Sequence, residues 1–436
     1  MIAENKQKEN KKRSIAYFFL IFSSVFLYVI LVLSRNIYIA EKTTLFSLGT
    51  FGNLTELASV NQYFFWTYAI MQVLLVFFVD KVNTKWFFSV TLTLSGILTV
   101  YVAFTNTIIE HYVIFAIMGL LQAGIWGGLI KILSQYLPAR LLPVANQYLT
   151  MGTAAGSAFA YGVAAAFGNN WRAPFLLVGI LVIFGVVLYF ASITIVAKYP
   201  RDIEMHHVVY ADGSEADVSD EEGNDFIHLN SKGRVIGFFV MSILLSVFLT
   251  ASYFMLSNNL DIYLKEIGNC SNETAKLLTI LAPLAAMIGP LVVVRICEKI
   301  KNFFVVGALF FSVAFTIAVL LYFVFNMSVL FSLILFALYL MLTNGGRTVL
   351  LSIAAFRMRA KLNVGVYTMA VNSVASIVAG FAPKLVTVFL DNESLGIINS
   401  WSASFLMTIA VNAVAIIGFI AIITILRFIN RKKKDA

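Results

Sequence analysis

Residues 15–40 read IAYFFLIFSSVFLYVILVLSRNIYIA. This run is long enough to cross a bilayer as one helix, which takes about 20 apolar residues. It is too long for the apolar region of a signal peptide, and it lacks an obvious small-residue cleavage site, so we interpret it as a membrane span. Near its end the run contains one charged residue, Arg35. The stretch therefore predicts a helical membrane protein with a charge inside the membrane.

Eleven further apolar stretches follow the first one. The composition agrees with a membrane protein, since 60% of the 436 residues are hydrophobic and 12% are charged, against about 45–50% and about 25% in soluble domains. These values exclude a soluble enzyme and a disordered protein. We predict an all-α membrane protein with twelve transmembrane helices, because helices bond their own backbone groups in lipid. The predicted spans are 15–40, 58–79, 86–105, 109–135, 143–167, 173–196, 235–263, 274–296, 303–325, 328–356, 364–389 and 402–427.

The positive charges predict the orientation of these spans. Most of the 31 Lys and Arg residues lie in the N-terminal tail, in the loops after even-numbered spans, and at the C-terminal end. The opposite side holds only Lys42, Arg172, Lys265 and Lys276. Because cytoplasmic loops carry the excess of Lys and Arg, both termini are predicted to be cytoplasmic, in the plasma (inner) membrane. The spread of charge around helix ends favours a lipid bilayer and excludes a nucleic-acid partner.

One long polar stretch, residues 198–234, separates the first six predicted spans from the last six. We interpret it as a solvated linker, with a regulatory contact as the alternative. The predicted organisation is then a basic cytoplasmic tail, an N-terminal six-helix bundle, the cytoplasmic linker, a C-terminal six-helix bundle and a basic C-terminal tail. Their bounds are 1–14, 15–197, 198–234, 235–427 and 428–436.

The two halves repeat a short pattern at the same offset. Gly127-Gly128 precedes Leu133-Ser134 in the fourth span, and Gly345-Gly346 precedes Leu351-Ser352 in the tenth. Similarly, Asp80-Lys81 follows the second span and Glu298-Lys299 follows the eighth. Such a repeat predicts two similar bundles related by an axis along the membrane normal.

With this repeat, the chain resembles the major facilitator superfamily over essentially its whole length. In that family the loop after the second span carries a Gly-x-x-x-Asp-Arg-x-Gly-Arg-Arg type signature. Residues 80–85 keep its acid and basic positions but lack its glycines. An acid at one helix end can pair with a base or with the N-terminus of a neighbouring helix, and so hold a gate closed. The resemblance implies a gating role, with a solvated loop as the alternative, for Asp80, Lys81, Lys85, Glu298 and Lys299.

Within the superfamily, the chain is most similar to the organophosphate:phosphate antiporter branch and its organic-anion relatives. The similarity rests on residues 35–40, 119–124 and 263–266. That branch has a phosphate-binding arginine in span 1 and another in span 7. The matching positions here are Ser34, with Arg35 one residue further on, and Tyr253. The resemblance implies a small organic anion, an organophosphate or a carboxylate, as substrate.

Charges inside the spans support an anionic substrate. Four basic residues lie within spans, Arg35, Lys131, Arg347 and Lys384, and no Asp or Glu lies near the middle of one. A basic cavity attracts anions, and a guanidinium can bind a carboxylate or phosphate through two hydrogen bonds. We predict a substrate-binding set, with structural bonding as the alternative for each member: Arg35, Arg347, Lys131, Asn344, Tyr253, Tyr38 and Gln122.

These features predict a secondary transporter that works by alternating access, and we expect it to act as a monomer. The sequence has no nucleotide-binding Gly-x-x-x-x-Gly-Lys-Ser/Thr loop and no metal-spaced Cys/His set, so we expect no enzyme activity and no cofactor. The lack of a mid-membrane acid favours exchange, uniport or coupling through the substrate's own charge over proton coupling. The alternatives are a carrier for neutral, apolar or cationic molecules, and a receptor-like protein that does not transport.

Overall fold

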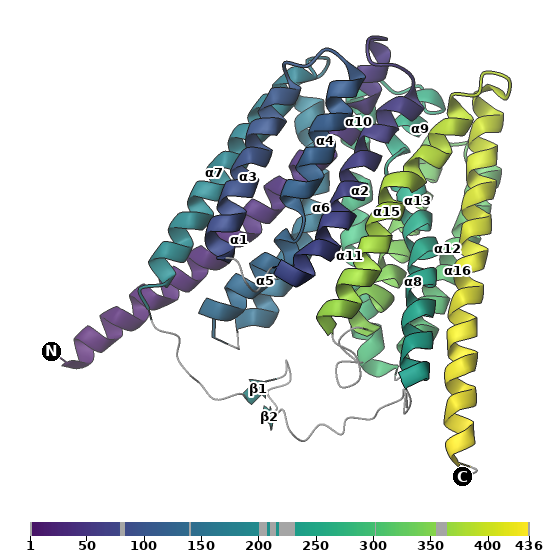
Figure 1. Ribbon diagram of the computed structural model, residues 1–436. Helices are drawn as coiled ribbons and strands as arrows, with labels where there is room; N and C mark the ends of the chain where they lie inside the picture. Colours follow the sequence, from purple (N-terminus) through teal and green to yellow (C-terminus); the bar gives the residue numbers. More distant parts are fainter. Residues whose placement is uncertain are drawn as a thin grey trace.

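The computed structural model describes residues 2–78, 83–138, 141–199, 207–209, 215–217, 232–300, 302–354 and 364–434. Within these ranges the regular secondary structure is helical, apart from one antiparallel pair of strands, β1 (His207–Val209) and β2 (Glu215–Asp217). Turns and short loops connect these elements. Figure 1 shows both chain ends, and the β1–β2 pair, at the same end of the molecule. An even number of membrane crossings produces this placement.

The helices of the first half pack mainly on one another. They are α1 (Ile2–Ser47), α2 (Leu54–Phe78), α3 (Thr84–Val102), α4 (Ile108–Gln122), α5 (Ile125–Tyr136), α6 (Leu142–Ala166) and α7 (Arg172–Val196). Helix α1 packs on α6 and α7, α3 packs on α7, and α2 packs on α4. Buried apolar side chains form two clusters between them, one around Phe115 and one around Phe88.

The second half repeats this arrangement. Its elements are α8 (Lys232–Ser257), α9 (Leu260–Glu266), α10 (Asn272–Thr279), α11 (Leu281–Lys299), α12 (Phe303–Val324), α13 (Val329–Thr348), the π-helical turn η2 (Val349–Ile353), α15 (Val364–Leu390) and α16 (Gly396–Lys434). Helix α11 packs on α13, α12 on α16, and α15 on α8. Two apolar clusters form here too, around Phe336 and Phe311.

Several spans that the sequence predicts as continuous are broken in the structure. The span 109–135 becomes α4 and α5, because Gly124 interrupts the helix in a left-handed backbone conformation with φ of 75°. Residues other than glycine rarely adopt this conformation. The span 235–263 becomes α8 and α9, with a turn at Asn258 and Asn259 between them. These breaks free backbone groups for contacts inside the membrane region.

Ten helical segments within the described residues are long and apolar enough to span a membrane. Helices α2 and α6, each of 25 residues, are also long enough but carry more polar and small side chains. The fold explains this difference. Helix α2 packs against α15, and α6 packs against α10 and α11, so parts of both face the opposite half rather than lipid. This arrangement is consistent with the twelve predicted spans.

Candidate functional site

Arg347, in the last turn of α13, is half-buried and has no carboxylate partner among the described residues. Its Nη1 donates to Asn344 Oδ1 at 3.3 Å, and its guanidinium lies 5.0 Å and 5.1 Å from the ring centres of Tyr253 and Phe254. Its Nε is buried and makes no hydrogen bond. Among the described residues no acid forms an ion pair with it. A guanidinium with a free donor can bind an anion.

Close packing of α11 and α13 fixes Arg347 in this position. A Cβ atom on Gly289 would lie 1.9 Å from the Met341 carbonyl oxygen, and one on Gly345 would lie 2.9 Å from the Gly289 carbonyl oxygen. Glycine at both positions therefore allows the backbones to touch. Asn344 strengthens this contact, since its Nδ2 donates to the Ala286 carbonyl at 2.8 Å. The same amide side chain thus links α11 to the arginine.

Arg35, in α1, is half-buried and interacts with the Tyr68 hydroxyl of α2. One turn earlier on α2, Phe65 meets Phe254 of α8 with ring centres 6.3 Å apart. Phe254 also contacts Arg347. The two arginines, one from each half, therefore lie on either side of a small aromatic group that spans the boundary between the halves.

Two other predicted substrate-binding residues form side-chain hydrogen bonds within the first half. The Tyr38 hydroxyl bonds to His111 Nδ1 at 3.0 Å. Gln122 Nε2 donates to the hydroxyls of Ser34 and Ser95 at 3.1 Å and 2.9 Å, while its Oε1 is buried and unbonded. Gln122 thus ties α4 to α1 and α3.

The remaining predicted residues that the structure describes lie toward the end of the molecule that holds the termini. Lys131 of α5 and Lys85 of α3 line one surface cleft of about 300 Å³. Lys85 Nζ donates to Thr194 Oγ1 at 2.7 Å and lies 4.0 Å from the Phe190 ring centre. Lys299 is exposed in the last turn of α11. The other gating candidates lie outside the described residues (Asp80 and Lys81) or outside the described side chains (Glu298).

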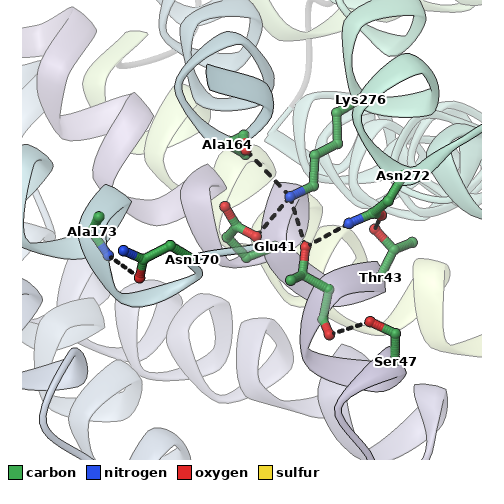
Figure 2. A network of polar contacts seen from close by, with 9 residues as sticks. Glu41, Thr43, Ser47, Ala164, Asn170, Ala173, Asn272 and Lys276 are labelled. Carbon is green, nitrogen blue, oxygen red and sulfur yellow. Dashed lines mark hydrogen bonds and ion pairs between the residues drawn. The ribbon is translucent and has the colours of Figure 1, made fainter. Parts of the chain in front are cut away.

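A buried ion pair joins the halves at the opposite end. Lys276 of α10 donates to Glu41 Oε2 of α1 at 2.7 Å, and both side chains are 0% exposed. Lys276 also donates to Thr44 Oγ1 at 2.7 Å and to the Ala164 carbonyl at 3.4 Å. Figure 2 shows Lys276 reaching across to Glu41 and Ala164, beside Asn272 and Thr43, which also bond to each other. We call this set of contacts between the halves the outer seam.

Lys42 and Asp391 extend the outer seam. Lys42 of α1 donates to the Asn258 carbonyl at 2.8 Å and to Asn259 Oδ1 at 2.9 Å, at the break between α8 and α9. Asp391, just after α15, accepts from the backbone N–H groups of Leu54 and Thr55 at 3.2 Å and 2.7 Å. These N–H groups open α2, where a helix has unbonded donors and a positive end. The carboxylate therefore caps a helix of the other half.

A small cavity lies beside Lys42 in the seam. Tyr38, Asn61 and Asn258 line it with Lys42, and its volume is about 10 Å³, which is room for about one water molecule. Both amide atoms of Asn61 and the Nδ2 of Asn258 are buried without a hydrogen-bond partner. The seam therefore contains unsatisfied hydrogen-bonding groups beside Lys42.

Sequence reasoning did not identify the seam residues as functional. It counted Lys42 and Lys276 only as outer charges, and it overlooked Asp261, which lies inside the predicted span 235–263. Two signals were available. Acid and base are adjacent at Glu41 and Lys42 at the end of the first span, and an acid within a span is itself a candidate for function. The pairing of residues so far apart in the chain required the fold.

The described residues include no group of three or more His, Cys, Asp or Glu side chains that could hold a metal ion. What the structure brings together is two arginines at the boundary between the halves and a charged seam at one end of it. Long apolar helices arranged in this way define a multi-pass membrane protein of the transporter class.

A family model for the Major Facilitator Superfamily matches residues 13–383. The chain belongs to this family, and the family predicted from the sequence is confirmed. The branch within it remains a prediction. Comparison with curated proteins gave no match.

Solved structures show the same fold. The chain is similar to a bacterial homologue of the human lysosomal transporter Spinster, in its inward-facing and unoccupied conformation, with 14% identity, a TM-score of 0.70, and 93% of this chain and 96% of that one covered. It is also similar to the nucleoside transporter NupG, with 16% identity, a TM-score of 0.62, and 93% and 98% covered. At these identities the likeness concerns the fold. Family and fold together indicate a secondary transporter rather than an enzyme.

Proposed function

We propose that this transporter moves a small organic anion, an organophosphate or a carboxylate, by alternating access. In this proposal the twelve spans form two six-helix bundles that rock about the substrate. The termini are cytoplasmic and the outer seam faces the opposite side of the membrane. The protein works as a monomer and is related to the organic-anion carriers of the family.

The contacts of Arg347 carry this proposal. Removing a charge partly from water without a counterion is costly, and aromatic faces compensate only part of that cost, about 0.5–2 kcal/mol per contact. Arg347 has two such faces, an amide oxygen 3.3 Å away, and an unbonded Nε. An anionic substrate would supply the missing negative charge and accept from the free donor.

Arg35 provides a second basic group from the other half. It approaches Tyr68 on the helix whose Phe65 contacts Phe254. A ligand between the halves would meet guanidinium groups at two sides and aromatic rings between them. This environment suits an anion with a flat or apolar body better than a compact inorganic ion. Tyr253 and Asn344 would orient it beside Arg347, while Lys131, Tyr38 and Gln122 remain further candidates.

Gating is assigned to both ends of the molecule. The outer seam holds one end together through Lys276, Lys42 and Asp391. We propose that Asp80, Lys81, Lys85, Glu298 and Lys299 form the matching contacts when the other end closes. Opposite gates that close in turn are what alternating access requires.

The test is a thermal-stability screen of the purified protein with sugar phosphates, carboxylates, nucleosides, amino acids and cationic drugs. A ligand at about 100 times its dissociation constant adds roughly 2.7 kcal/mol to the free energy of unfolding. We expect a stabilising shift with one class of anion, and loss of that shift in Arg347→Gln. Uptake of the same anion into proteoliposomes should be lost as well.

Arg172→Gln is the matched control. Arg172 is an exposed arginine that also stacks on an aromatic ring, Trp171, and also bonds to an amide oxygen, that of Asn106. It should leave the anion shift unchanged. Shifts with cations or neutral compounds alone, or an anion shift that survives in Arg347→Gln, would overturn the assignment. Binding without uptake would identify a receptor-like protein instead.

A further inference from the structure

Asp261 is a fully buried carboxylate that makes no hydrogen bond. It lies in the first turn of α9, is 0% exposed, and has both carboxylate oxygens buried without a partner. The N–H groups of Asp261 and Ile262 approach these oxygens without reaching hydrogen-bonding geometry. Buried polar groups are bonded in the great majority of cases, so this carboxylate needs an explanation.

Three other acids at the same end have partners. Glu41 is paired with Lys276. Glu266, on the same helix as Asp261, accepts from Trp401 Nε1 at 3.0 Å. Asp391 accepts from two backbone N–H groups of α2. Asp261 differs from all three. This difference indicates that its carboxyl group is ionised only part of the time.

Charged and titratable groups from four elements face Asp261. Lys42 of α1 and Lys276 of α10 are the cations that act on it, and Glu266 of its own helix and Tyr161 of α6 also interact with it. Neither cation bonds to it. Lys276 forms an ion pair with Glu41. Lys42 donates hydrogen bonds to two neutral oxygen atoms and also interacts electrostatically with Asp391.

We propose that Asp261 is a proton-binding site, loaded when the outer seam closes, and that proton binding there is coupled to binding of the anion. An ionised carboxylate without hydrogen bonds is costly in a dry interior, whereas the protonated carboxyl is neutral. Closing the seam brings α1 and α6 of the opposite half, with Lys42 and Tyr161, against Asp261 and removes water, so one proton is bound. Opening the seam readmits water, and the proton leaves the carboxyl oxygen for solvent.

The coupling to the anion rests on the proposed function. The Tyr161 hydroxyl is buried and unbonded and interacts with both Asp261 and Tyr253. Tyr253 in turn contacts Arg347. This series of groups leads from the seam to the predicted anion site. A negative charge bound beside Arg347 favours the protonated form of Asp261, and by linkage the proton favours anion binding to the same degree.

The experiment measures seam opening in the full chain without any substrate. Spin labels are placed at Leu48→Cys and Glu393→Cys, two exposed positions on opposite halves, in a Cys270→Ser background in lipid nanodiscs. Distances between the labels give the ratio of open to closed seam from about pH 5 to pH 8. If one proton is bound on closing, this ratio rises with pH by up to tenfold per unit. In Asp261→Asn the seam should stay closed at every pH.

Two further variants make the outcome decisive. Asp261→Ser is a second neutral replacement in case the Asn variant does not fold, and it should also abolish the pH dependence. Glu266→Gln, a neighbouring acid on the same helix, should keep the wild-type dependence. A ratio independent of pH in the wild type, or a dependence that survives in both Asp261 variants, would overturn the proton site.

The coupling has a separate readout. Adding the anion found in the stability screen to weakly buffered protein should take up about one proton per chain in the wild type and none in Asp261→Asn. Arg347→Gln should lose the anion response but keep the pH dependence of the seam. If the screen finds no anion, the proposed substrate class fails while the spin-label result for Asp261 still stands. If anion binding takes up no proton, the coupling between Asp261 and the anion site is wrong.

Discussion

The outer seam and the region around Arg347 both contain charged groups within the membrane region, but the neighbours of these groups differ. In the seam, Lys276 meets a carboxylate at 2.7 Å, and Asp391 meets the N-terminus of a helix. Around Arg347 the neighbours are two aromatic rings and an amide, and a nitrogen atom is left unbonded.

This difference separates two uses of charge in the same membrane region. Charges that are paired across the halves hold one conformation together and release it when the pairs separate. A charge without a counterion in the protein can instead bind a counterion from outside the chain, such as a charged substrate. On this argument the seam closes the molecule, and Arg347 recognises what the molecule carries. Four substitutions test the distinction, from the largest expected effect to the smallest.

Lys276→Met should have the largest effect. It leaves Glu41 buried without its cation, and breaking a buried pair in this way costs about 3–5 kcal/mol. We expect the closed seam to lose that stability, measured as a shift toward the open distance between spin labels at Leu48→Cys and Glu393→Cys. The double variant Glu41→Gln/Lys276→Met removes both charges and should recover most of the closed population. If Lys276→Met alone stays closed, the pair does not hold the seam.

Arg347→Lys should have the second-largest effect. It should weaken binding of the anion rather than change the conformation of the protein. Lysine keeps the charge but not the planar pair of donors. Loss of a charge-assisted hydrogen bond costs about 1.5–3 kcal/mol, or roughly 10- to 150-fold in dissociation constant for the anion. Calorimetric titration of the anion identified in the screen measures this. Equal affinity in both proteins would mean that Arg347 acts only as a point charge.

Asp391→Asn should weaken the seam moderately. It keeps an oxygen acceptor but removes the negative charge from the N-terminus of α2, an interaction worth about 0.3–1 kcal/mol. The open fraction of the seam should rise several-fold at low salt and less at high salt, because salt screens this interaction. A salt-independent result would show that hydrogen bonding, rather than charge, is what Asp391 contributes.

Asp80→Asn combined with Glu298→Gln should have the smallest effect. These acids are predicted to close the end that carries the termini, and exposed pairs contribute about 0.2–1 kcal/mol. We expect a modest shift toward the state in which that end is open, and no change in anion affinity. Spin labels on the two halves at that end provide the measurement. An unchanged distribution would remove these residues from the gate.

Much of the fold could be predicted from residue patterns, because lipid imposes a simple rule on the backbone. A span such as 15–40 must be helical, since only a helix bonds all of its own N–H and C=O groups. The repeat at Gly127 and Gly345 indicated two similar halves, and the superfamily followed. The breaks at Gly124 and at Asn258-Asn259 were not predicted, because the hydropathy averaged over a span does not change at a short turn.

The candidate site was predictable only in part. Arg347 was identified because a charge inside a span is unusual. Its aromatic neighbours and its unbonded Nε could not be inferred, since they depend on how α8 and α13 meet. Gln122 was equally prominent in the sequence, yet its amide group bonds Ser34 and Ser95 inside one half. Sequence position alone does not show which way a helix side chain faces.

The sequence by itself determined that this chain is a helical membrane protein, that it belongs to the Major Facilitator Superfamily, and that its spans are rich in base and poor in acid. Only the tertiary structure decided which charges meet. Glu41 and Lys276 are more than 200 residues apart, and Asp261 is buried by helices from the opposite half. The physical reason is that hydropathy is a property of each segment, whereas the pairing or isolation of a charge depends on what packs around it.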